Sequence, residues 1–461
     1  MRQAFARLAL LLSVAVIACG HAAEPRRLRV TADHRFLEYT DGTPFFYLGD
    51  TAWDLFSRLN RDEAAGYFAN RAAKGFTVIQ ASVLASEGGV TTPNANGDLP
   101  LVNLDPAQPN EAYFKHVDAL VREAAKDGLT MGLLPSWGHY WKQTDKERLF
   151  TAASARTFGE FLGRRYREDP VIWILGGDQD ISSPEDRAVI EAFAAGLHAG
   201  DGGAHLITYH PRGPGRSSDS LPDTAWLDFQ MGQSSHGAHD HDNGLSTEHD
   251  YALTPVKPTL DGESRYETMP VGFYYINASR LDRFDDYDVR QAAYWSMLAG
   301  ACGHTYGNNN VWQFWQPGRE AQIWANQRWS DSLDTPGAFQ MGVLRRLFES
   351  RPYQQLVPAP GMLRDAPLSG GAKVRAACAR DGSFAFIYSP RGENFTVDRD
   401  NLKAARLREI WFDPRYGVSY EVHTTSTHGF QTYAPPTSGR GQDWVLIIED
   451  AAKKWPLPGA R

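Results

Sequence analysis

Between residues 44 and 350 the chain alternates eight apolar runs of strand length with stretches of helical periodicity, and this alternation restricts its fold more than any other feature. Strands that are separated by helices build a parallel sheet, because each connection has to cross back before the next strand begins. The eight runs are 45–49, 77–83, 130–135, 171–175, 205–209, 226–231, 258–261 and 303–306.

Eight strands, each followed by a helix, in roughly 300 residues predict an α/β protein with a (β/α)8 TIM barrel. The intervening helices have recognisable ends: Asn60 with Glu63 predicts a capping box, and Ser183 before Pro184 predicts another helix start. A doubly wound open sheet is the alternative. The segment 49–53 after the first strand, Gly-Asp-Thr-Ala-Trp, argues against it because it is not a Gly-rich phosphate loop.

After residue 351 the helical periodicity disappears. Short alternating strands, such as 383–388 and 444–448, are separated there by Gly, Pro and Asp turns. This pattern predicts a small C-terminal antiparallel β-sandwich. We therefore expect a barrel domain over residues 24–351 and a β-sandwich accessory domain over residues 352–461.

Residues 1–23 have the layout of a secretory signal peptide, with Arg2 and Arg7 before an apolar stretch and small residues at the end. Residues 16–19 also resemble a bacterial lipoprotein cleavage site, in which Cys19 would carry the lipid; a plain cut near residue 22 or 23 is the alternative. We expect export to the periplasm, the extracellular space or the bacterial cell envelope, with membrane contact only through Cys19. The remaining Cys302 and Cys378 lie in different predicted domains and give no disulfide framework.

The charge and aromatic composition narrow the class of partner. Lys and Arg total 47 against 55 Asp and Glu, which gives a net charge of −8, and no basic run is present. The electrostatic footprint of a nucleic-acid-binding protein is therefore missing. The 13 Trp and 19 Tyr exceed what a core of this size needs, so we expect many of them to line a cleft. A carbohydrate is the expected partner.

In a TIM barrel the residues just beyond the strand ends surround one mouth, so they can be interpreted as a single set. In this chain the set is polar and aromatic, and such side chains suit the alternating apolar and hydroxylated surfaces of a sugar. The residues that we expect to bind substrate are Asp50, Trp53, Trp137, His139, Tyr140, His210, Gln230, Gln233, Asn308 and Trp312.

Two acidic residues stand out within this set because of the strands that precede them. Asp178 follows the apolar strand 171–175 through two glycines, and Glu263 follows the strand 258–261 through one glycine. Glycine at a strand end permits close backbone approach to a ligand. Cleavage of a glycosidic bond needs one acid to protonate the leaving oxygen and one carboxylate to attack or assist at the anomeric carbon. The pair predicts Asp178 as acid/base and Glu263 as nucleophile, with Asp180 and Asp261 as the local alternatives.

The segments 46–53 (Phe-Tyr-Leu-Gly-Asp-Thr-Ala-Trp), 173–178 (Trp-Ile-Leu-Gly-Gly-Asp) and 261–263 (Asp-Gly-Glu), with the β-rich tail, resemble the apiosidase-like glycoside hydrolases of family 140. The resemblance covers nearly the whole mature chain. It implies a retaining (β/α)8 enzyme with its catalytic carboxylates on strands four and seven. It also implies a C-terminal sandwich labelled a collagen-binding domain of a collagenase, a label that we do not take as a collagen activity.

By this resemblance, Asp178 is the acid/base and Glu263 the nucleophile of a double displacement, and the substrate is an apiose-linked side chain of the pectic polysaccharide rhamnogalacturonan II. The chain departs from the wider clan in one respect. The clan's acid/base Glu normally follows an Asn, whereas here Gly177 precedes the shorter Asp178. A compact furanose such as apiose fits a shorter acid, and an arabinofuranoside fits it equally well.

Two further alternatives remain open from the sequence. The loop 236–242, His-Gly-Ala-His-Asp-His-Asp, contains the residue types of a metal site. Its residues crowd on one loop, however, so we favour a wet, substrate-facing loop and expect no metal and no cofactor. A non-catalytic carbohydrate-binding protein would share the same aromatic mouth, and the loss of hydrolysis in an Asp178→Asn variant would separate the two functions.

Overall fold

The computed structural model describes residues 26–459 except Glu87 and residues 426–427. The predicted signal peptide of residues 1–23, with Cys19, lies outside the described residues, and so does Glu87, which follows the second predicted strand. Among the helices that the structure describes, none is long and apolar enough to cross a membrane.

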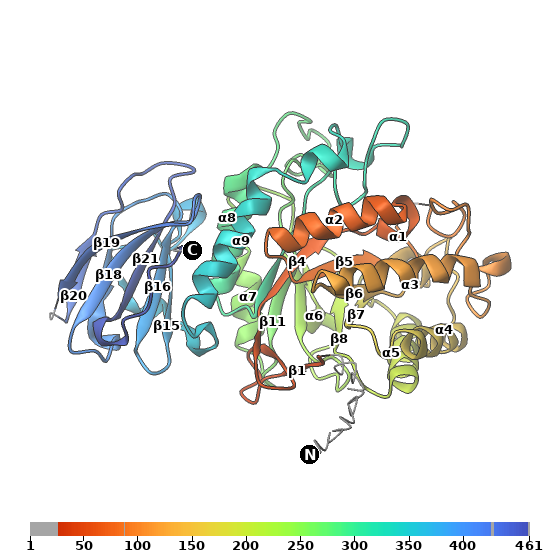
Figure 1. The fold of residues 1–461 in the computed structure, drawn as a ribbon, viewed down its shortest axis with the longest axis horizontal. Helices are drawn as coiled ribbons and strands as arrows, with labels where there is room; N and C mark the ends of the chain where they lie inside the picture. The colour runs from red at the N-terminus through yellow and green to blue at the C-terminus, as the bar shows by residue number, and fades with distance from the viewer. Residues whose placement is uncertain (1–25, 87, 426–427, 460–461) are drawn as a thin grey trace, which may run out of the picture.

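The N-terminal part of the chain is a barrel of eight parallel strands, which Figure 1 shows with helices packed around it. Its strands are β4 (Tyr47–Thr51), β5 (Val78–Ser82), β6 (Thr130–Leu134), β7 (Val171–Gly176), β8 (Ile207–His210), β10 (Gln230–Gln233), β11 (Thr259–Glu263) and β12 (Gly303–Tyr306). A short strand, β9 (Gly215–Arg216), joins the edge of β10 in antiparallel orientation. Each of the eight predicted runs therefore overlaps a barrel strand.

The strand order distinguishes the barrel from the doubly wound alternative. The first barrel strand, β4, pairs in parallel with the last, β12, which an open doubly wound sheet does not allow. The remaining gap lies between β8 and β10, where Asp228 N–H donates to the Ile207 carbonyl at 2.9 Å and the Thr208 hydroxyl donates to the Phe229 carbonyl. The predicted TIM barrel is confirmed.

The helices begin and end where their side chains satisfy free backbone groups. Asn60 and Glu63 form the predicted capping box of α2, and the Ser183 side chain caps α5 immediately before Pro184. The helices are α1 (Leu55–Arg58), α2 (Arg61–Ala73), α3 (Glu111–Lys126), α4 (Ala152–Arg165), α5 (Pro184–Asp201), α6 (Ser217–Ser220), α7 (Gly244–Tyr251), α8 (Asp286–Leu298) and α9 (Pro336–Glu349). Short 3₁₀ turns are η1 (Val102–Leu104), η2 (Gly138–Tyr140), η3 (Gln322–Trp324), η4 (Trp329–Ser332), η5 (Tyr353–Gln355), η6 (Pro360–Met362), η7 (Gly370–Ala372), η8 (Arg399–Asn401) and η9 (Ala451–Lys453).

Two antiparallel sheets form the C-terminal domain after α9, and a small three-stranded sheet precedes the barrel. The N-terminal strands are β1 (Leu28–Val30), β2 (Leu37–Tyr39) and β3 (Pro44–Phe45). The larger C-terminal sheet has the order β13 (Leu356–Pro358), β15 (Arg375–Ala379), β16 (Phe384–Ser389), β21 (Trp444–Asp450), β18 (Leu407–Asp413) and β19 (Val418–Thr425). The smaller one has the order β14 (Leu363–Arg364), β17 (Phe395–Asp398) and β20 (Phe430–Tyr433).

The larger C-terminal sheet is buried on both faces. Along β16, Phe384 and Phe386 pack into the same hydrophobic cluster as the barrel, whereas Ala385 and Ile387 pack into a second cluster with the smaller sheet. Successive side chains of a strand point to opposite faces, so one strand serves both cores. Figure 1 shows α8 and α9 between the barrel and this sheet. The C-terminal domain therefore packs directly against the barrel and is not attached through a flexible linker alone.

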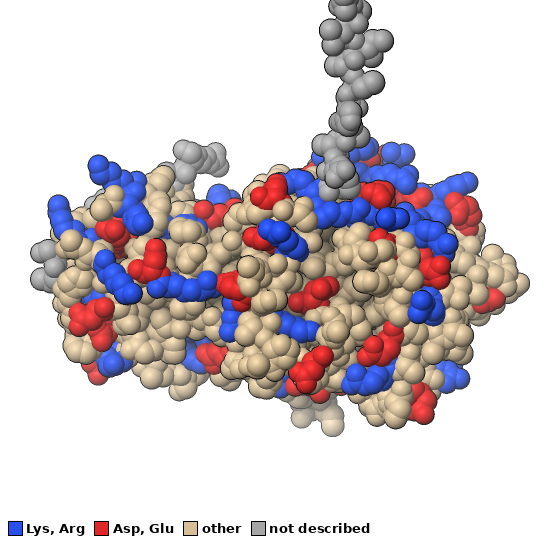
Figure 2. Space-filling model, turned by 90° about the horizontal axis from the view of Figure 1, so that it is seen from below, with Lys and Arg blue, Asp and Glu red and all other residues tan. Residues whose placement is uncertain are grey.

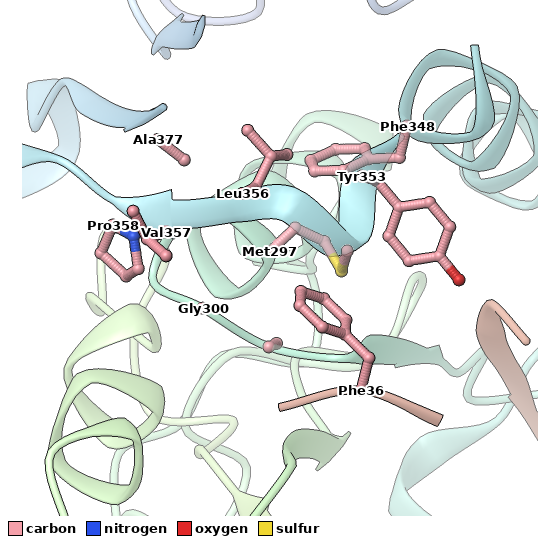
Figure 3. A pocket seen from close by; sticks show the side chains of 10 residues that line it. Phe36, Met297, Gly300, Phe348, Tyr353, Leu356, Val357, Pro358 and Ala377 are labelled. Carbon is pink, nitrogen blue, oxygen red and sulfur yellow. The ribbon is translucent and has the colours of Figure 1, made fainter. Parts of the chain in front are cut away.

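An apolar seam fills part of the junction between the two domains. Met297 at the end of α8, Phe348 in α9 and Leu356 in β13 converge there, with Phe36 of the N-terminal sheet opposite them (Figure 3). The remaining space between these side chains is only about 10 Å³, which leaves almost no room for water. On the outer face shown in Figure 2, acidic and basic side chains intermingle over both domains.

Candidate active site

The end of β7 turns sharply because three successive residues have positive φ: Gly176 at 93°, Gly177 at 81° and Asp178 at 60°. A Cβ at Gly176 would lie 2.2 Å from the His210 carbonyl oxygen, so only glycine permits β8 to approach so closely. Asp is among the few side chains that tolerate the left-handed region. The Asp178 backbone N–H donates to His210 Nδ1 at 3.3 Å, which fixes the turn against β8.

At the end of β11, Glu263 is almost fully buried and accepts three side-chain hydrogen bonds. His210 Nε2 lies 3.1 Å from Oε2, and Gln233 Nε2 and His236 Nε2 each lie 3.0 Å from Oε1. Gln233 is the register partner of Glu263 across a bulge in the β10–β11 pair. The three donors come from β8, from β10 and from the loop after β10, so neighbouring parts of the barrel mouth converge on one carboxylate.

His210 links the two acidic strand ends. Its Nδ1 accepts from Asp178 N–H, so the ring proton resides on Nε2 and is donated to Glu263. The ring is fully buried and packs edge-on against Trp53, with ring centroids 5.3 Å apart, while Trp137 lies 6.5 Å away. These two indoles shield the His210 bridge from water.

The two carboxyl groups are held in opposite protonation states. Burial and, second, the negative charge of Glu263 raise the pKa of Asp178 to about 6, from an ordinary value of 3.8. Burial alone would raise the pKa of Glu263 as well. The hydrogen bonds from His210 and His236 outweigh burial and hold the pKa of Glu263 below its ordinary value of 4.5. Near pH 5 one group is therefore a proton donor and the other a carboxylate.

A pocket of about 610 Å³ opens at Asp178. Gln233 and His236, two of the donors to Glu263, also line it, and Arg212 and His241 contribute to its polar wall. The aromatic segment 273–275 (Phe-Tyr-Tyr) also lines it, and its Tyr side chains are about half exposed. Polar groups beside exposed aromatic faces form a surface that suits a sugar ring.

Of the predicted site residues, the structure brings together Asp178, Glu263, His210 and Gln233, with Trp53 and Trp137 packed behind them. The other six do not belong to the lining of the Asp178 pocket, and Gln230 is the first residue of β10, away from the carboxyl end of the strand where it is predicted. The six are Asp50, His139, Tyr140, Gln230, Asn308 and Trp312.

Three of these six have polar partners within the barrel wall. Asp50 forms an ion pair with Arg71 at 2.6 Å in which neither side chain is exposed. Gln230 accepts from the Ser217 hydroxyl, and Trp312 Nε1 donates to the Asn309 side chain. The substrate-binding roles of all ten residues stay predictions.

The remaining three are also largely covered. His139 and Tyr140 lie on η2 with their rings in contact, 4.0 Å between centroids, and Asn308 is buried beside Thr268.

The two local alternatives to the catalytic pair, Asp180 and Asp261, have other partners. Asp180 accepts from the Arg212 backbone, and Asp261 accepts from Ser234 and Asn243 inside the barrel wall.

Sequence reasoning missed His236, Arg212 and the Tyr274–Tyr275 pair as site residues. The sequence does signal His236, because the His-rich loop 236–242 is predicted to face the substrate. The run Phe-Tyr-Tyr at 273–275 was a second signal, a dense aromatic cluster in the connection after β11. Among the described residues, no group of three or more His, Cys, Asp or Glu side chains is arranged to hold a metal ion.

The barrel and the C-terminal domain each match a known family. The family "Apiosidase-like, catalytic domain" matches residues 31–355, and the family "Putative collagen-binding domain of a collagenase" matches residues 357–449. The chain belongs to the apiosidase-like glycoside hydrolases. The predicted resemblance to the apiosidase-like enzymes and to the collagen-binding domain is thereby confirmed, and the predicted catalytic pair lies within the residues that the apiosidase-like model matches.

Two solved structures resemble this apiosidase-like chain over almost its whole length. One, described as a glycoside hydrolase, is 31% identical, with a TM-score of 0.85 over 93% of this chain and 97% of its own. The other, a glycoside hydrolase family 5 protein from Bacteroides vulgatus ATCC 8482, is 30% identical, with a TM-score of 0.86 over 93% and 95%. A search of curated protein sequences gave no match.

Proposed function

We propose that this apiosidase-like enzyme is an exported, retaining furanosidase that uses Asp178 as acid/base and Glu263 as nucleophile. The observation that carries the proposal is the pair of acids at the ends of β7 and β11 that His210 links, because its ring accepts from the Asp178 backbone N–H and donates to the Glu263 carboxylate. Burial raises the pKa of Asp178 and hydrogen bonds lower the pKa of Glu263, which supports opposite protonation states for the two acids. Opposed protonation of neighbouring carboxyls is the usual way in which a glycosidase assigns its acid and its nucleophile.

In the first step Glu263 attacks the anomeric carbon while Asp178 protonates the leaving oxygen, so the glycosidic bond breaks and a glycosyl ester forms on Glu263. Esterification removes the negative charge of Glu263, which is the second cause of the raised pKa of Asp178. The pKa of Asp178 then falls, and its carboxylate takes a proton from water as water attacks the ester. The second displacement restores the original anomeric configuration and both starting charges.

The sugar is proposed to be a furanose, with apiose as the first candidate. The short Asp178, reached through two glycines, supports a compact ring placed deep against the turn. The membership in the apiosidase-like family supports apiose-linked side chains of rhamnogalacturonan II as the natural substrate, and export would bring the enzyme to such a polysaccharide. Arabinofuranosides have the same ring size and are the matched alternative.

The test is hydrolysis of synthetic apiosides and arabinofuranosides, followed by ¹H NMR of the first anomer released. We expect faster cleavage of the apioside and release of the anomer with the starting configuration. Release of the opposite anomer would overturn the double displacement, because an inverting enzyme activates water between more distant carboxyls. The absence of any hydrolysis, together with measurable sugar binding, would favour the carbohydrate-binding alternative.

A further inference from the structure

The loop 234–243, between β10 and α7, has two different faces. On one face, His236 and His241 line the pocket, and His236 donates to Glu263. On the other face, Asp240 and Asp242 contact the C-terminal domain. The imidazoles of His236 and His241 thus face the substrate side and the two carboxylates face the accessory domain, so a single short segment connects the pocket with that domain.

The contact at Asp242 is the tighter of the two. Its Oδ2 lies 2.7 Å from Lys373 Nζ, and its Oδ1 lies 2.7 Å from an Arg375 guanidinium nitrogen. Arg375 also contacts Glu248 in α7, the helix that follows the loop. The side chains of Asp242 and Arg375 are only 12% and 5% exposed, so solvent screens this ion pair weakly.

The contact at Asp240 fits closely around a glycine. Arg391, in the turn after β16, lies 2.8 Å from Asp240 Oδ2. A Cβ at Gly371 would lie 2.0 Å from Asp240 Oδ1, so any larger residue at position 371 would displace the carboxylate. The C-terminal domain therefore presents three cations and a close backbone surface to the outer face of the loop.

The barrel holds the same loop from the inside. Asn243 Nδ2 donates to Asp261 on β11 at 2.8 Å, and an Arg265 guanidinium nitrogen donates to the His239 carbonyl. The His239 ring lies between the carboxylates of Asp282 and Asp288. Each of these contacts fixes the part of the loop that follows His236, and the cations of the C-terminal domain hold the same part from outside.

We infer that the C-terminal domain is a positioning element of the active site, which clamps the loop 234–243 so that His236 stays in hydrogen-bond contact with Glu263. Arg375 and Asp242 are the positioning residues. This inference rests on the proposed function for its kinetic readout. It assigns the sandwich a role at the barrel mouth that requires no ligand of its own.

The test compares Arg375→Ala with Arg380→Ala in the full-length protein. Arg380 follows β15, the same strand that contains Arg375, and forms an ion pair with Asp33 of the N-terminal sheet, far in sequence from the loop. Arg380→Ala thus breaks an interdomain pair without touching the clamp. We expect Arg375→Ala to lower kcat on a furanoside by about 10- to 100-fold, the usual result of displacing a group at a reacting centre. Arg380→Ala is expected to retain kcat within twofold, and Arg375→Lys to recover most of the loss.

A double-mutant cycle with His236→Ala separates positioning from general structural damage. If Arg375 acts through His236, adding Arg375→Ala to His236→Ala lowers kcat by less than about twofold further, because residues in one network are not additive. Equal losses in both backgrounds, or equal kcat for the two Arg variants, would overturn the inference. Asp242→Asn removes the Arg375–Asp242 ion pair from the loop side and repeats the test should Arg375→Ala fold poorly.

Hydrogen exchange supplies a readout that does not depend on activity. The backbone amides of residues 234–243 are expected to exchange faster in Arg375→Ala than in the wild type or Arg380→Ala, since local opening governs exchange. Unchanged exchange in Arg375→Ala would refute the clamp whatever the enzyme hydrolyses. A wild type that hydrolyses no glycoside, with faster loop exchange in Arg375→Ala, would refute the proposed function and leave the clamp standing.

Discussion

The ends of β7 and β11 look alike in the sequence and differ in what surrounds their acids. Both strands reach an acid through glycine, and Glu263 is buried whereas Asp178 is partly buried. Glu263 accepts from three side chains, whereas among the described residues no side chain donates to the Asp178 carboxylate. Burial raises the pKa of both groups, and only the donors around Glu263 reverse that effect. Hydrogen-bond donors, and not depth, assign the two roles.

Replacing Glu263, the carboxylate that accepts three side-chain hydrogen bonds, should lower activity the most. Glu263→Gln keeps the size of the side chain but removes the nucleophile, so no glycosyl ester forms even on a substrate with an activated leaving group. We expect kcat to fall by more than the ~10²- to 10⁴-fold that general acid catalysis alone contributes. Steady-state kinetics on a 4-nitrophenyl furanoside provides the measurement. A loss that disappears on this substrate would place the nucleophile elsewhere.

Replacing Asp178 should lower activity by less, and the size of the loss should depend on the substrate. Asp178→Asn cannot protonate the leaving oxygen, so cleavage of a natural glycoside should fall by about 10²- to 10⁴-fold. With 4-nitrophenolate, which leaves without protonation, formation of the glycosyl ester should stay fast and only its hydrolysis should slow down. A burst of nitrophenolate in stopped-flow absorbance would reveal this pattern. Equal losses on both substrates would contradict an acid role for Asp178.

The pH dependence of kcat/KM measures the difference between the pKa values of Asp178 and Glu263. Asp178 has to be protonated to act as acid, so activity is expected to fall as the pH rises through about 6. Glu263 has to be ionised, so activity is lost on the acid side only below its lowered pKa. The charged or titratable groups facing Glu263 are Asp178, His210 and His236, and Tyr266 adds a neutral phenol.

Removing one hydrogen-bond donor to Glu263 should shift the acid limb of the pH profile. His236→Ala deletes a hydrogen bond to a charged group, worth about 1.5–3 kcal/mol, so the acid limb should shift upward by at least roughly one pH unit. The basic limb, set mainly by the burial of Asp178, should move less. Parallel profiles of wild type and variant provide the comparison. An unchanged acid limb would show that His236 does not stabilise the Glu263 carboxylate.

The barrel was predictable because every level of the sequence agrees on it. The eight apolar runs, the capping box at Asn60 and the start at Ser183 all occur as predicted, and only the strand ends differ by a few residues. The runs 205–209 and 226–231 begin earlier than β8 (Ile207–His210) and β10 (Gln230–Gln233). The hydrophobic pattern of a strand does not indicate at which residue its pairing with a parallel neighbour begins. Hydrophobic pattern is thus enough for topology and insufficient for register.

The site was predictable only where a residue is the last one of a strand or closely follows it. Asp178, Glu263, His210 and Gln233 meet this condition, and the structure brings them together. His236 and the Tyr274–Tyr275 pair lie on long connections, and the path of the loop that contains His236 depends on contacts with α8 and with the C-terminal domain. The His239–Asp288 and Asp242–Arg375 contacts join residues 49 and 133 positions apart, and no local pattern encodes them.

Asp50 extends the comparison to a third acid at a strand end, and its replacement should have the smallest effect on activity. It lies in β4, fully buried, where Arg71 and Tyr67 both donate to Oδ2. Asp50→Asn leaves the Arg71 charge buried without its partner, so the free energy of unfolding should fall by about 3–5 kcal/mol. Well below the unfolding temperature, kcat and KM should stay within twofold of the wild type, because the Asp178 pocket does not include Asp50.

Thermal unfolding followed by circular dichroism measures the loss of stability in Asp50→Asn. The exposed Asp41→Asn serves as control, with almost no change in stability expected because its ion pair with Arg26 is open to water. A raised KM with unchanged stability would instead make Asp50 a sugar-binding residue.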